Sequence, residues 1–473
     1  MTMPRSTPSE QGVDAKGILA LLDALETPGH GTHSLMIARH GHVIAEGWWA
    51  PYAAERVHLG YSLSKSFTST TLGILVGQGV IDLDAPVVSY LVDLDTVHPT
   101  WRKVTVRHCI TMTAGHTQEA WDWRGDKALN GSPGQNDPVL AAILSTKVPD
   151  GEPGEVWAYN QVATYLVAQA IAAVTGQPLT QHVRNLVIDP LTGDPARAHR
   201  TPQGRDLGFS GMHLTTATIL ALAQTWLDGG RWNGEQLVPA DFAAWAPRPT
   251  PASLRAEGDG DWAFGYGASF WGASHGYRGD GAAGQYAVVL PEHDLAVAIT
   301  SEVEVMQNTL DALWAHLLPA VDAATDSAAD AGLANRLANL THPVLAGEAG
   351  PSAPVQVSRD PASQLPGEYA TANLEAIDSG HRLTITGPAG DVTIAVGDGR
   401  WLESSWPTPF GQELAVAASG GWRQGWFEAE LRLVETPHLI RATIDPAAGS
   451  VRLDWRLVPL TGADPSYLVS FPF

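Results

Sequence analysis

The spacing of apolar positions predicts a helix followed by a hairpin at the start of the chain. Residues 13–26 carry Ile18, Leu21 and Leu25 at helical intervals, so an amphipathic helix is expected there. In residues 33–49, apolar stretches flank a polar turn at 39–42, which predicts a β-hairpin.

Further helices that end near glycines precede a second group of strands. We expect helices over 62–76, 160–174 and 214–227, strands over 285–290 and 295–300, and a helix over 305–318. Pairing of the early hairpin with the late strands would give one mixed domain with a helical insert at about 80–250. The pattern therefore predicts an α+β domain, an antiparallel sheet flanked by helices, over residues 1–335.

The pattern changes in the last part of the chain. Residues 336–366 are rich in Ala, Pro, Ser and Asp, which is typical of a linker. Short alternating runs separated by Gly, Asp and Pro follow, at 382–385, 392–396, 413–417, 440–444 and 451–457. They predict a separate all-β domain, a small barrel or sandwich, over residues 367–473.

Composition narrows the range of partners. The chain has 473 residues and a net charge of −22, a charge that repels nucleic acid and anionic membranes. We therefore expect neither as a partner. The N-terminal segment MTMPRSTPSEQGVDAKG has no apolar stretch, and no run of about 18 apolar residues occurs anywhere, so a cytoplasmic location is expected.

The thiol and imidazole groups do not form a recognisable metal or disulfide pattern. Cys109 is the single cysteine, which excludes an internal disulfide, and its apolar neighbours indicate a core residue. Histidines at 30, 33, 40 and 42 lie near one another without a cysteine or clustered carboxylates, and strand and turn positions explain them better than a metal site does.

The strongest candidate for chemistry is YSLSKSFT, residues 61–68. Ser62 and Lys65 are three positions apart, which places them on one face of the predicted helix. The positive end of the helix dipole favours alkoxide character at Ser62, and a desolvated Lys65 can lose its proton and act as a base. The alternative is a solvated helix face, for which so many neighbouring Ser and Thr residues would be unusual.

Two later segments could complete a site. Tyr159 comes just before the helix predicted at 160–174; beside a lysine its pKa could fall, so that it acts as general base or acid. A buried aromatic residue at the helix entry is the alternative. The small residues of GDGAAGQ, 279–285, would let a substrate lie against an edge strand and a backbone N–H face an oxyanion. A simple β-bulge or turn is the alternative.

Together these segments resemble the motifs of the serine β-lactamase, penicillin-binding protein and family VIII esterase superfamily. The resemblance extends from about residue 10 to 320, and the segments at 79–91, 105–116 and 211–239 also look like stretches of this superfamily. It implies a β-lactamase-like fold for the first domain, related to class C β-lactamases and 6-aminohexanoate-dimer hydrolases, and chemistry through an acyl-enzyme.

The resemblance also implies roles for single residues. Ser62 is similar to the acylated serine, Lys65 to its paired base, and Tyr159 to the tyrosine of the Tyr-x-Asn motif. Gln161 stands where that motif has asparagine, so its amide is expected to contact the substrate. The backbone N–H groups of Ser62 and Ala282 would form the oxyanion hole.

The third motif departs from the superfamily. Gly279-Asp280-Gly281 stands where penicillin-recognising members have Lys-Thr-Gly or His-Thr-Gly. An acid there would repel a β-lactam carboxylate, at a cost of about 1–3 kcal/mol in binding, so efficient β-lactamase activity is not expected. Asp280 and Gly281 remain substrate-binding candidates, and Asp280 with Asp122 or Asp126 could suit a substrate amine.

A competing nucleophile is Ser274, because GASHG at 272–276 matches Gly-x-Ser-x-Gly. That elbow needs a helix after the serine, whereas a turn and a strand are predicted here, so we favour Ser62. Aromatic residues near the motifs either line a pocket or pack in the core: Trp121, Trp123, Trp262, Tyr266, Phe270 and Trp271.

The sequence thus predicts a serine hydrolase that acts on small carboxylic esters and needs no metal or organic cofactor. The alternatives are an amidase or peptidase on small oligoamides or D-amino-acid peptides, less favourably a β-lactamase, and a catalytically silent binding protein. A small ester or amide is the expected partner. The sequence leaves open the oligomeric state, a homo-oligomer included, and the role of the C-terminal domain.

Overall fold

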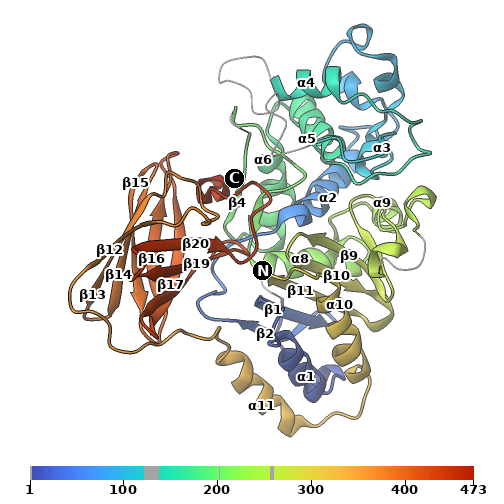
Figure 1. Cartoon of the computed structure of the whole chain (residues 1–473). Coiled ribbons are helices and arrows are strands. Elements are labelled where there is room, and N and C mark those ends of the chain that lie inside the picture. Colours follow the sequence, from blue (N-terminus) through green and yellow to red (C-terminus); the bar gives the residue numbers. More distant parts are fainter. Residues whose placement is uncertain (1–2, 122–137, 202, 256–259) are drawn as a thin grey trace. The chain divides into compact units, whose positions relative to one another are not determined.

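The chain folds into two compact units in a computed structural model that describes residues 3–121, 138–201, 203–255 and 260–473 (Figure 1). The first unit comprises the described residues up to Gly47, together with Leu59–Ala338 and Phe471–Phe473. The second comprises Trp48–His58 and Asn339–Ser470.

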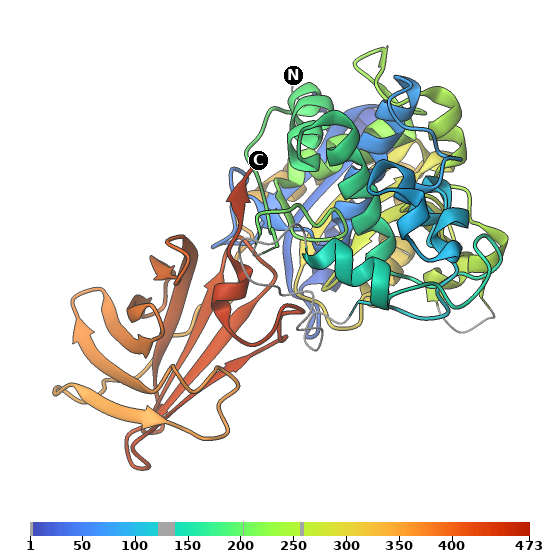
Figure 2. The same ribbon diagram turned by 90° about the horizontal axis from the view of Figure 1, so that it is seen from above.

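A six-stranded sheet forms the centre of the first unit, in the order β2-β1-β11-β10-β9-β8. Figure 2 shows strands of this unit surrounded by its helices. As expected from the sequence, the early hairpin pairs with the late strands, with Leu35 of β1 opposite Ile299 of β11 in antiparallel register. The strands are β1 (Thr32–Arg39), β2 (His42–Trp48), β8 (Trp271–Ala273), β9 (Gly276–Gly281), β10 (Gln285–Leu290) and β11 (Leu295–Ser301).

Helices cover both faces of this sheet. Helix α8 (Thr216–Leu227) packs on one face against β1, β10 and β11. On the other face, the Tyr286 hydroxyl donates to the carbonyl oxygen of Met306, just before α10 (Gln307–Ala312), at 2.9 Å. Because both faces are covered, every residue of β1, β10 and β11 is buried.

The predicted helices of the first unit are present and begin at recognisable N-caps. The side chains of Asp14, Asn160 and Thr215 accept hydrogen bonds from backbone N–H groups in the first turns of α1, α5 and α8. The remaining described helices are α1 (Ala15–Leu25), α2 (Ser64–Gly77), α3 (Val106–Ile110), α4 (Pro138–Thr146), α5 (Gln161–Thr175), α6 (Leu179–Val183), α7 (Asp189–Leu191), α9 (Ala240–Trp245) and α11 (Ser327–Ala338).

Short strands complete the first unit. A four-stranded sheet has the order β21-β4-β5-β3, and β6 pairs with β7. The strands are β3 (His58–Leu59), β4 (Ala196–Ala198), β5 (Met212–Leu214), β6 (Arg231–Trp232), β7 (Glu235–Gln236) and β21 (Phe471–Pro472).

The second unit is built from nine strands in the order β15-β14-β13-β12-β20-β19-β18-β17-β16. A further parallel pairing of Gly397 with Ser419 joins β15 to β17, so the sheet closes on itself. Alternate residues point inward, as Leu383 and Ile385 do on β14. The strands are β12 (Val355–Arg359), β13 (Thr371–Ile377), β14 (Gly380–Gly387), β15 (Gly390–Gly397), β16 (Leu402–Pro407), β17 (Glu413–Arg423), β18 (Trp426–Leu433), β19 (Leu439–Asp445) and β20 (Ser450–Trp455).

The unit boundaries differ from those expected. The segment 336–366, interpreted as a linker, contains β12, which pairs with β13 and β20. This strand was not predicted, because it is only five residues long and lies within a Pro- and Ser-rich segment that is typical of a linker. The expected boundaries also misassigned two short segments, since 48–58 belong to the second unit and 471–473 to the first.

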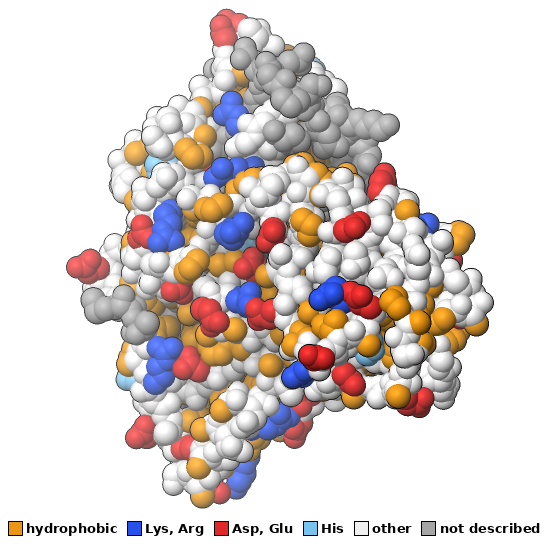
Figure 3. Space-filling view, turned by 90° about the vertical axis from the view of Figure 1, so that its left-hand side faces the viewer, with side chains coloured by type: hydrophobic (Ala, Val, Ile, Leu, Met, Phe, Trp, Pro, Cys, Tyr) orange, Lys and Arg blue, Asp and Glu red, His pale blue; other side chains and the backbone are white. Residues whose placement is uncertain are grey.

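On the face in Figure 3, acidic and basic side chains are interspersed. Some of the exposed charges form ion pairs, as Arg382 and Glu375 do at 2.7 Å. No single described helix has the length and hydropathy needed to cross a bilayer; one bent pair, Gln161–Thr175 with Leu179–Leu191, reaches them only when its members are combined.

Candidate active site

Ser62 lies in a 3-10 turn, Tyr61–Leu63, that leads directly into α2. The residue before it, Tyr61, has a left-handed backbone with φ 46°, which costs a non-glycine residue about 1–2 kcal/mol. Burial of the Tyr61 side chain holds this conformation in place. The Ser62 side chain is thereby left partly exposed at the positive end of the α2 dipole.

The small hydroxyl residues of α2 satisfy the carbonyl groups of buried loops. The Ser66 hydroxyl donates to Ser269 O at 2.9 Å, and the Thr68 hydroxyl donates to Gly208 O at 2.7 Å. Ser64 to Leu75 are all buried, so the alternative of a solvated helix face is wrong. The helix lies inside the unit, and its hydroxyl groups supply the hydrogen bonds that water would otherwise donate to these buried carbonyl groups.

Lys65 lies among three oxygen atoms. Its Nζ is 3.1 Å from Ser62 Oγ, 2.6 Å from Gln161 Oε1 and 2.8 Å from the Phe209 carbonyl oxygen. A neutral amine has two N–H groups and one lone pair. Two of its hydrogens can therefore stay on Gln161 and Phe209 while the lone pair faces Ser62 Oγ.

Burial makes that neutral form accessible. The Lys65 side chain is 1% exposed. Desolvation lowers the pKa of Lys65 from 10.5 to about 7, although the negative charges of Glu119 and Asp280 act in the opposite direction. At neutral pH a large part of Lys65 can accept a proton.

Tyr159 lies beside Lys65 in an aromatic environment. Its ring centroid is 4.6 Å from Lys65 Nζ, Trp271 stacks on the ring at 5.7 Å, and Tyr266 meets it edge-on at 5.8 Å. Burial raises the pKa of Tyr159 well above 10, and a hydrogen bond with Ser62 offsets only part of this rise. The expectation of a lowered pKa was wrong, because desolvation of Tyr159 among these rings is the largest cause of the shift and raises its pKa.

Glycines bring the third motif up to the start of α2. A Cβ on Gly281 would lie 2.0 Å from Gly60 O, and a Cβ on Gly279 would lie 2.5 Å from Ser66 Oγ. Residues 279–281 form the end of β9, and the turn of this motif is confined to 282–284. At positions 279 and 281 only glycine fits.

The turn after β9 carries Ala282. Gln285 Nε2 donates to Ala282 O at 3.2 Å, and the Ser301 hydroxyl donates to Ala283 O at 2.9 Å. The fold thus fixes this turn, which directly follows the strand that touches the Ser62 turn. Ser62, Lys65, Tyr159 and the third motif are brought together as the sequence predicted.

A protein-family model described as Beta-lactamase matches residues 22–318, more than half of the chain. The chain belongs to the β-lactamase family. This is a family of serine hydrolases for the most part, and the β-lactamase-like fold inferred from the motifs is confirmed. The identity of its substrate is a separate question, since members differ in chemistry on one fold.

One curated relative and several solved structures are similar to this β-lactamase-family protein. An uncharacterized protein of Alkalihalophilus pseudofirmus is 22% identical over 239 residues, which span 44% of this chain and 62% of that protein, less than two thirds of its length. SurE is 18% identical with a TM-score of 0.53, covering 90% of this chain and 98% of SurE.

Two other structures share the fold. The octameric penicillin-binding protein homologue of Pyrococcus abyssi is 14% identical with a TM-score of 0.52, covering 88% of this chain and 97% of that one. A family VIII carboxylesterase is 16% identical with a TM-score of 0.50, covering 65% of this chain and 99% of that one. At these identities the likeness concerns the fold alone.

Asp280 in this β-lactamase-family protein is occupied by an internal ion pair. Arg278 Nε lies 3.1 Å from Asp280 Oδ2, and Arg278 also stacks on the Trp262 ring at 4.5 Å. Asp280 is 8% exposed. Its carboxylate is thus already paired within the protein, and the predicted contact with a substrate amine would have to compete with Arg278. Asp122 and Asp126, the other acids considered, and Trp123 lie outside the described residues.

The competing nucleophile Ser274 lies in the exposed turn between β8 and β9. A strand, not a helix, follows it, so the geometry of a nucleophile elbow is absent there. Among the aromatic candidates, Trp121 packs against Tyr165 and Phe209 in the core, whereas Trp271 and Tyr266 contact Tyr159.

Sequence reasoning missed Glu119 and Arg278. Glu119 accepts hydrogen bonds from the backbone and side chain of Gln161, 42 positions away, and Arg278 neutralises Asp280. Neither residue belongs to a spacing pattern. The one available signal was that Arg278 is two positions before Asp280, which places both on one face of a strand.

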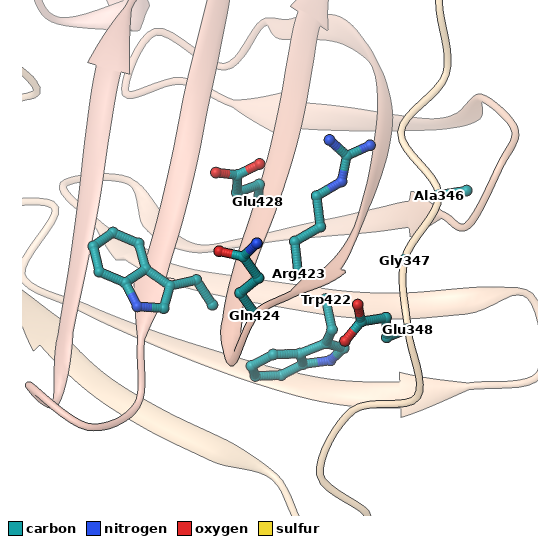
Figure 4. A pocket seen from close by; sticks show the side chains of 8 residues that line it. Ala346, Gly347, Glu348, Trp422, Arg423, Gln424 and Glu428 are labelled. Carbon is teal, nitrogen blue, oxygen red and sulfur yellow. The ribbon is translucent and has the colours of Figure 1, made fainter.

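A separate pocket of about 990 Å³ lies in the second unit (Figure 4). All of its lining residues belong to the second unit. The lining residues are Ala346, Gly347, Glu348, Trp422, Arg423, Gln424, Trp426 and Glu428.

Proposed function

We propose that the protein is a serine hydrolase that cleaves small carboxylic esters through an acyl-enzyme on Ser62. The observation that carries this proposal is the contact of Ser62 Oγ with Lys65 Nζ at 3.1 Å. Lys65 is buried, and its pKa is lowered to about 7, which suits a general base at neutral pH.

In the acylation step, the lone pair of Lys65 takes the hydroxyl proton of Ser62 while Oγ forms a bond to the ester carbonyl carbon. The backbone N–H groups of Ser62 and Ala282 would hold the oxyanion, each worth about 3 kcal/mol in the transition state. The close approach of Gly281 to Gly60 O supports this assignment, because it brings the β9 end against the Ser62 turn.

The tetrahedral intermediate then expels the alcohol, which needs a proton. Tyr159 stays a neutral phenol because its pKa is raised, so it can pass a proton from Lys65 to the leaving oxygen without ionising. Water, activated by the same pair, attacks the acyl-enzyme and restores the Ser62 hydroxyl.

The third motif favours neutral esters over β-lactams. Gly279 stands where penicillin-recognising relatives place a cation. Even a Cβ at this position would meet Ser66 Oγ at 2.5 Å, so the strand offers no room for a cationic side chain. A substrate carboxylate would therefore lack the cationic partner that it has in those relatives.

An amidase or peptidase that accepts D-amino-acid residues is the second candidate. The observation that favours it is coverage. A structure of SurE with D-Leu covers 86% of this chain with a TM-score of 0.52, whereas the family VIII carboxylesterase covers 65%. Both chemistries would use the same acyl-enzyme.

The test is hydrolysis of p-nitrophenyl acetate and butyrate, a D-leucine anilide, a 6-aminohexanoate dimer and nitrocefin. Ser62→Ala should lower ester hydrolysis by at least about 1,000-fold, and Ser274→Ala should leave it unchanged. The preferred substrate decides between esterase, amidase and β-lactamase.

Covalent labelling separates an enzyme from a silent binder. A fluorophosphonate should add one adduct to Ser62, seen by mass spectrometry of the peptide. Activity that survives Ser62→Ala would overturn the proposal, and a wild-type protein with neither adduct nor turnover would favour a binding function.

A further inference from the structure

Glu119 is held against the N-terminus of α5 by several donors. Its Oε1 accepts from the backbone N–H of Trp121 at 2.9 Å and of Gln161 at 3.1 Å. Its Oε2 accepts from Gln161 Nε2 at 3.0 Å. Glu119 is an exposed residue, but these hydrogen bonds fix the orientation of its carboxylate.

Gln161 links this carboxylate to the candidate base. Its Nε2 donates to Glu119, and its Oε1 accepts from Lys65 Nζ at 2.6 Å. A carboxylate can only accept hydrogen bonds. Glu119 therefore selects one of the two orientations of the Gln161 amide, the one with oxygen toward Lys65.

We infer that Glu119 is a positioning residue of the Ser62 site: it fixes the Gln161 amide with its oxygen toward Lys65 and places a negative charge beside the protonated amine. The inference rests on the proposed function, because it concerns the base of that reaction. With Gln161 and Phe209 O holding two N–H groups of Lys65, the remaining position of Nζ is directed at Ser62.

The charged and titratable groups around Lys65 come from four segments. Glu119 lies in the loop after α3, and Tyr159 lies at the entry of α5 with Tyr266 against its ring. Asp280 on β9 is paired with Arg278. Both acids raise the pKa of Lys65 against desolvation, the larger effect. No cation in the described part of the chain forms an ion pair with Glu119, whereas Arg278 does so with Asp280. The charge of Glu119 therefore acts on Lys65 with less compensation.

The two effects of Glu119 separate in the Glu119→Gln variant. Loss of the negative charge makes proton release from Lys65 easier, so the acidic limb of the pH profile moves to lower pH. The new amide can present its own NH₂ group to Gln161 Nε2, and the Gln161 amide then turns away from its productive orientation. The plateau rate falls for this second reason.

The experiment measures the rate of fluorophosphonate modification of Ser62 in the full chain between pH 5.5 and 9. For Glu119→Gln we expect the rate at pH 6 relative to pH 8.5 to rise about two- to threefold over wild type. The plateau rate should fall about tenfold. Glu155→Gln, which removes an exposed acid four positions before Tyr159, should leave both quantities unchanged.

Two further variants serve as controls for the charge of Glu119 and for its effect on the Gln161 amide. Glu119→Asp keeps the charge, so its acidic limb should stay at the wild-type pH even if its plateau falls, and it serves if Glu119→Gln does not fold. In a Gln161→Ala background, Glu119→Gln should no longer lower the plateau. An unchanged limb and plateau in folded Glu119→Gln would overturn the inference, whereas a wild-type protein that is not modified at Ser62 would overturn the proposed function itself.

Discussion

At the scale of single residues, the site depends on a lysine that the fold keeps partly unprotonated. Lys65 is buried among Ser62, Gln161 and Phe209, and no carboxylate is bonded to it directly in the described structure. A lysine in such a place destabilises the folded protein wherever the unfolded chain would hold the proton. Function and stability are therefore opposed at this position.

Replacing Lys65 with methionine should expose that opposition. The folded pKa is about 7 and the unfolded value 10.5, so between them the unfolded chain binds more protons and wild-type stability rises with pH. This contribution has a slope of up to about 1.4 kcal/mol per pH unit. The Met variant lacks it, so the difference in unfolding free energy, variant minus wild type, should decrease from pH 7.5 to 9.5 in urea titrations. A difference independent of pH would mean that folded Lys65 stays protonated.

The sequence predicted the residues of the site better than their electrostatics. Ser62 and Lys65 could be paired because helical spacing is local. The predicted direction of the Tyr159 pKa shift was wrong. The pKa depends on burial by Trp271 and Tyr266, which lie more than 100 positions later in the chain. Glu119 could not be found, since its link to Gln161 requires a loop to fold back on α5.

At the scale of elements, β9 approaches the turn that carries Ser62 and the start of α2 at two glycines, so that no side chain of the strand lies between them at these positions. The sequence showed a run of small residues at 279–285 but could not distinguish a strand from a turn, since glycine fits both. The distances decide, because neither Gly279 nor Gly281 has space for a methyl group. The glycines are thus a requirement of packing between two elements.

A methyl group at Gly281 should push β9 away from Ser62. We expect Gly281→Ala to lower the unfolding free energy by about 1–3 kcal/mol and ester hydrolysis by more than the stability loss explains. Gly332→Ala in α11 is the matched control, because a Cβ there meets nothing within 4 Å. The control should be neutral or stabilising by up to about 1 kcal/mol. Equal thermal stability and activity of Gly281→Ala and wild type would contradict the packing argument.

At the scale of the whole molecule, the chain passes between its two units more often than the sequence suggested. The expected order was one domain, a linker and a second domain. Contacts of residues 48–58 and 471–473 depend on tertiary pairing and leave no periodic signal in such short segments. Within the second unit, by contrast, five of the nine strands were predicted, because apolar residues alternate along them, whereas β12, β13, β16 and β18 were not.

Removal of residues 471–473 should act on the first unit. Phe471 and Pro472 of β21 pair with Ala198 and Arg197 of β4, and the Phe473 N–H donates to Ala196 O at 3.3 Å. Without them we expect amide hydrogens of β4 to exchange at least about tenfold faster, with β18 and β19 unchanged. Unchanged exchange in β4 would show that β21 contributes nothing to its stability.

The return of the chain to β4 also bears on how such a protein could be assembled from parts. Along the sequence, segments of the first unit lie on both sides of the second unit. One segment of the second unit, 48–58, lies far upstream of the rest of that unit, which begins at residue 339. A single recombination event near residue 339 would therefore transfer neither unit as a whole, because each would keep a segment from the other parent. Chimeras between relatives should keep 48–58, 339–470 and 471–473 from compatible parents, which is a constraint on recombination that a plot of domains along the sequence would not reveal.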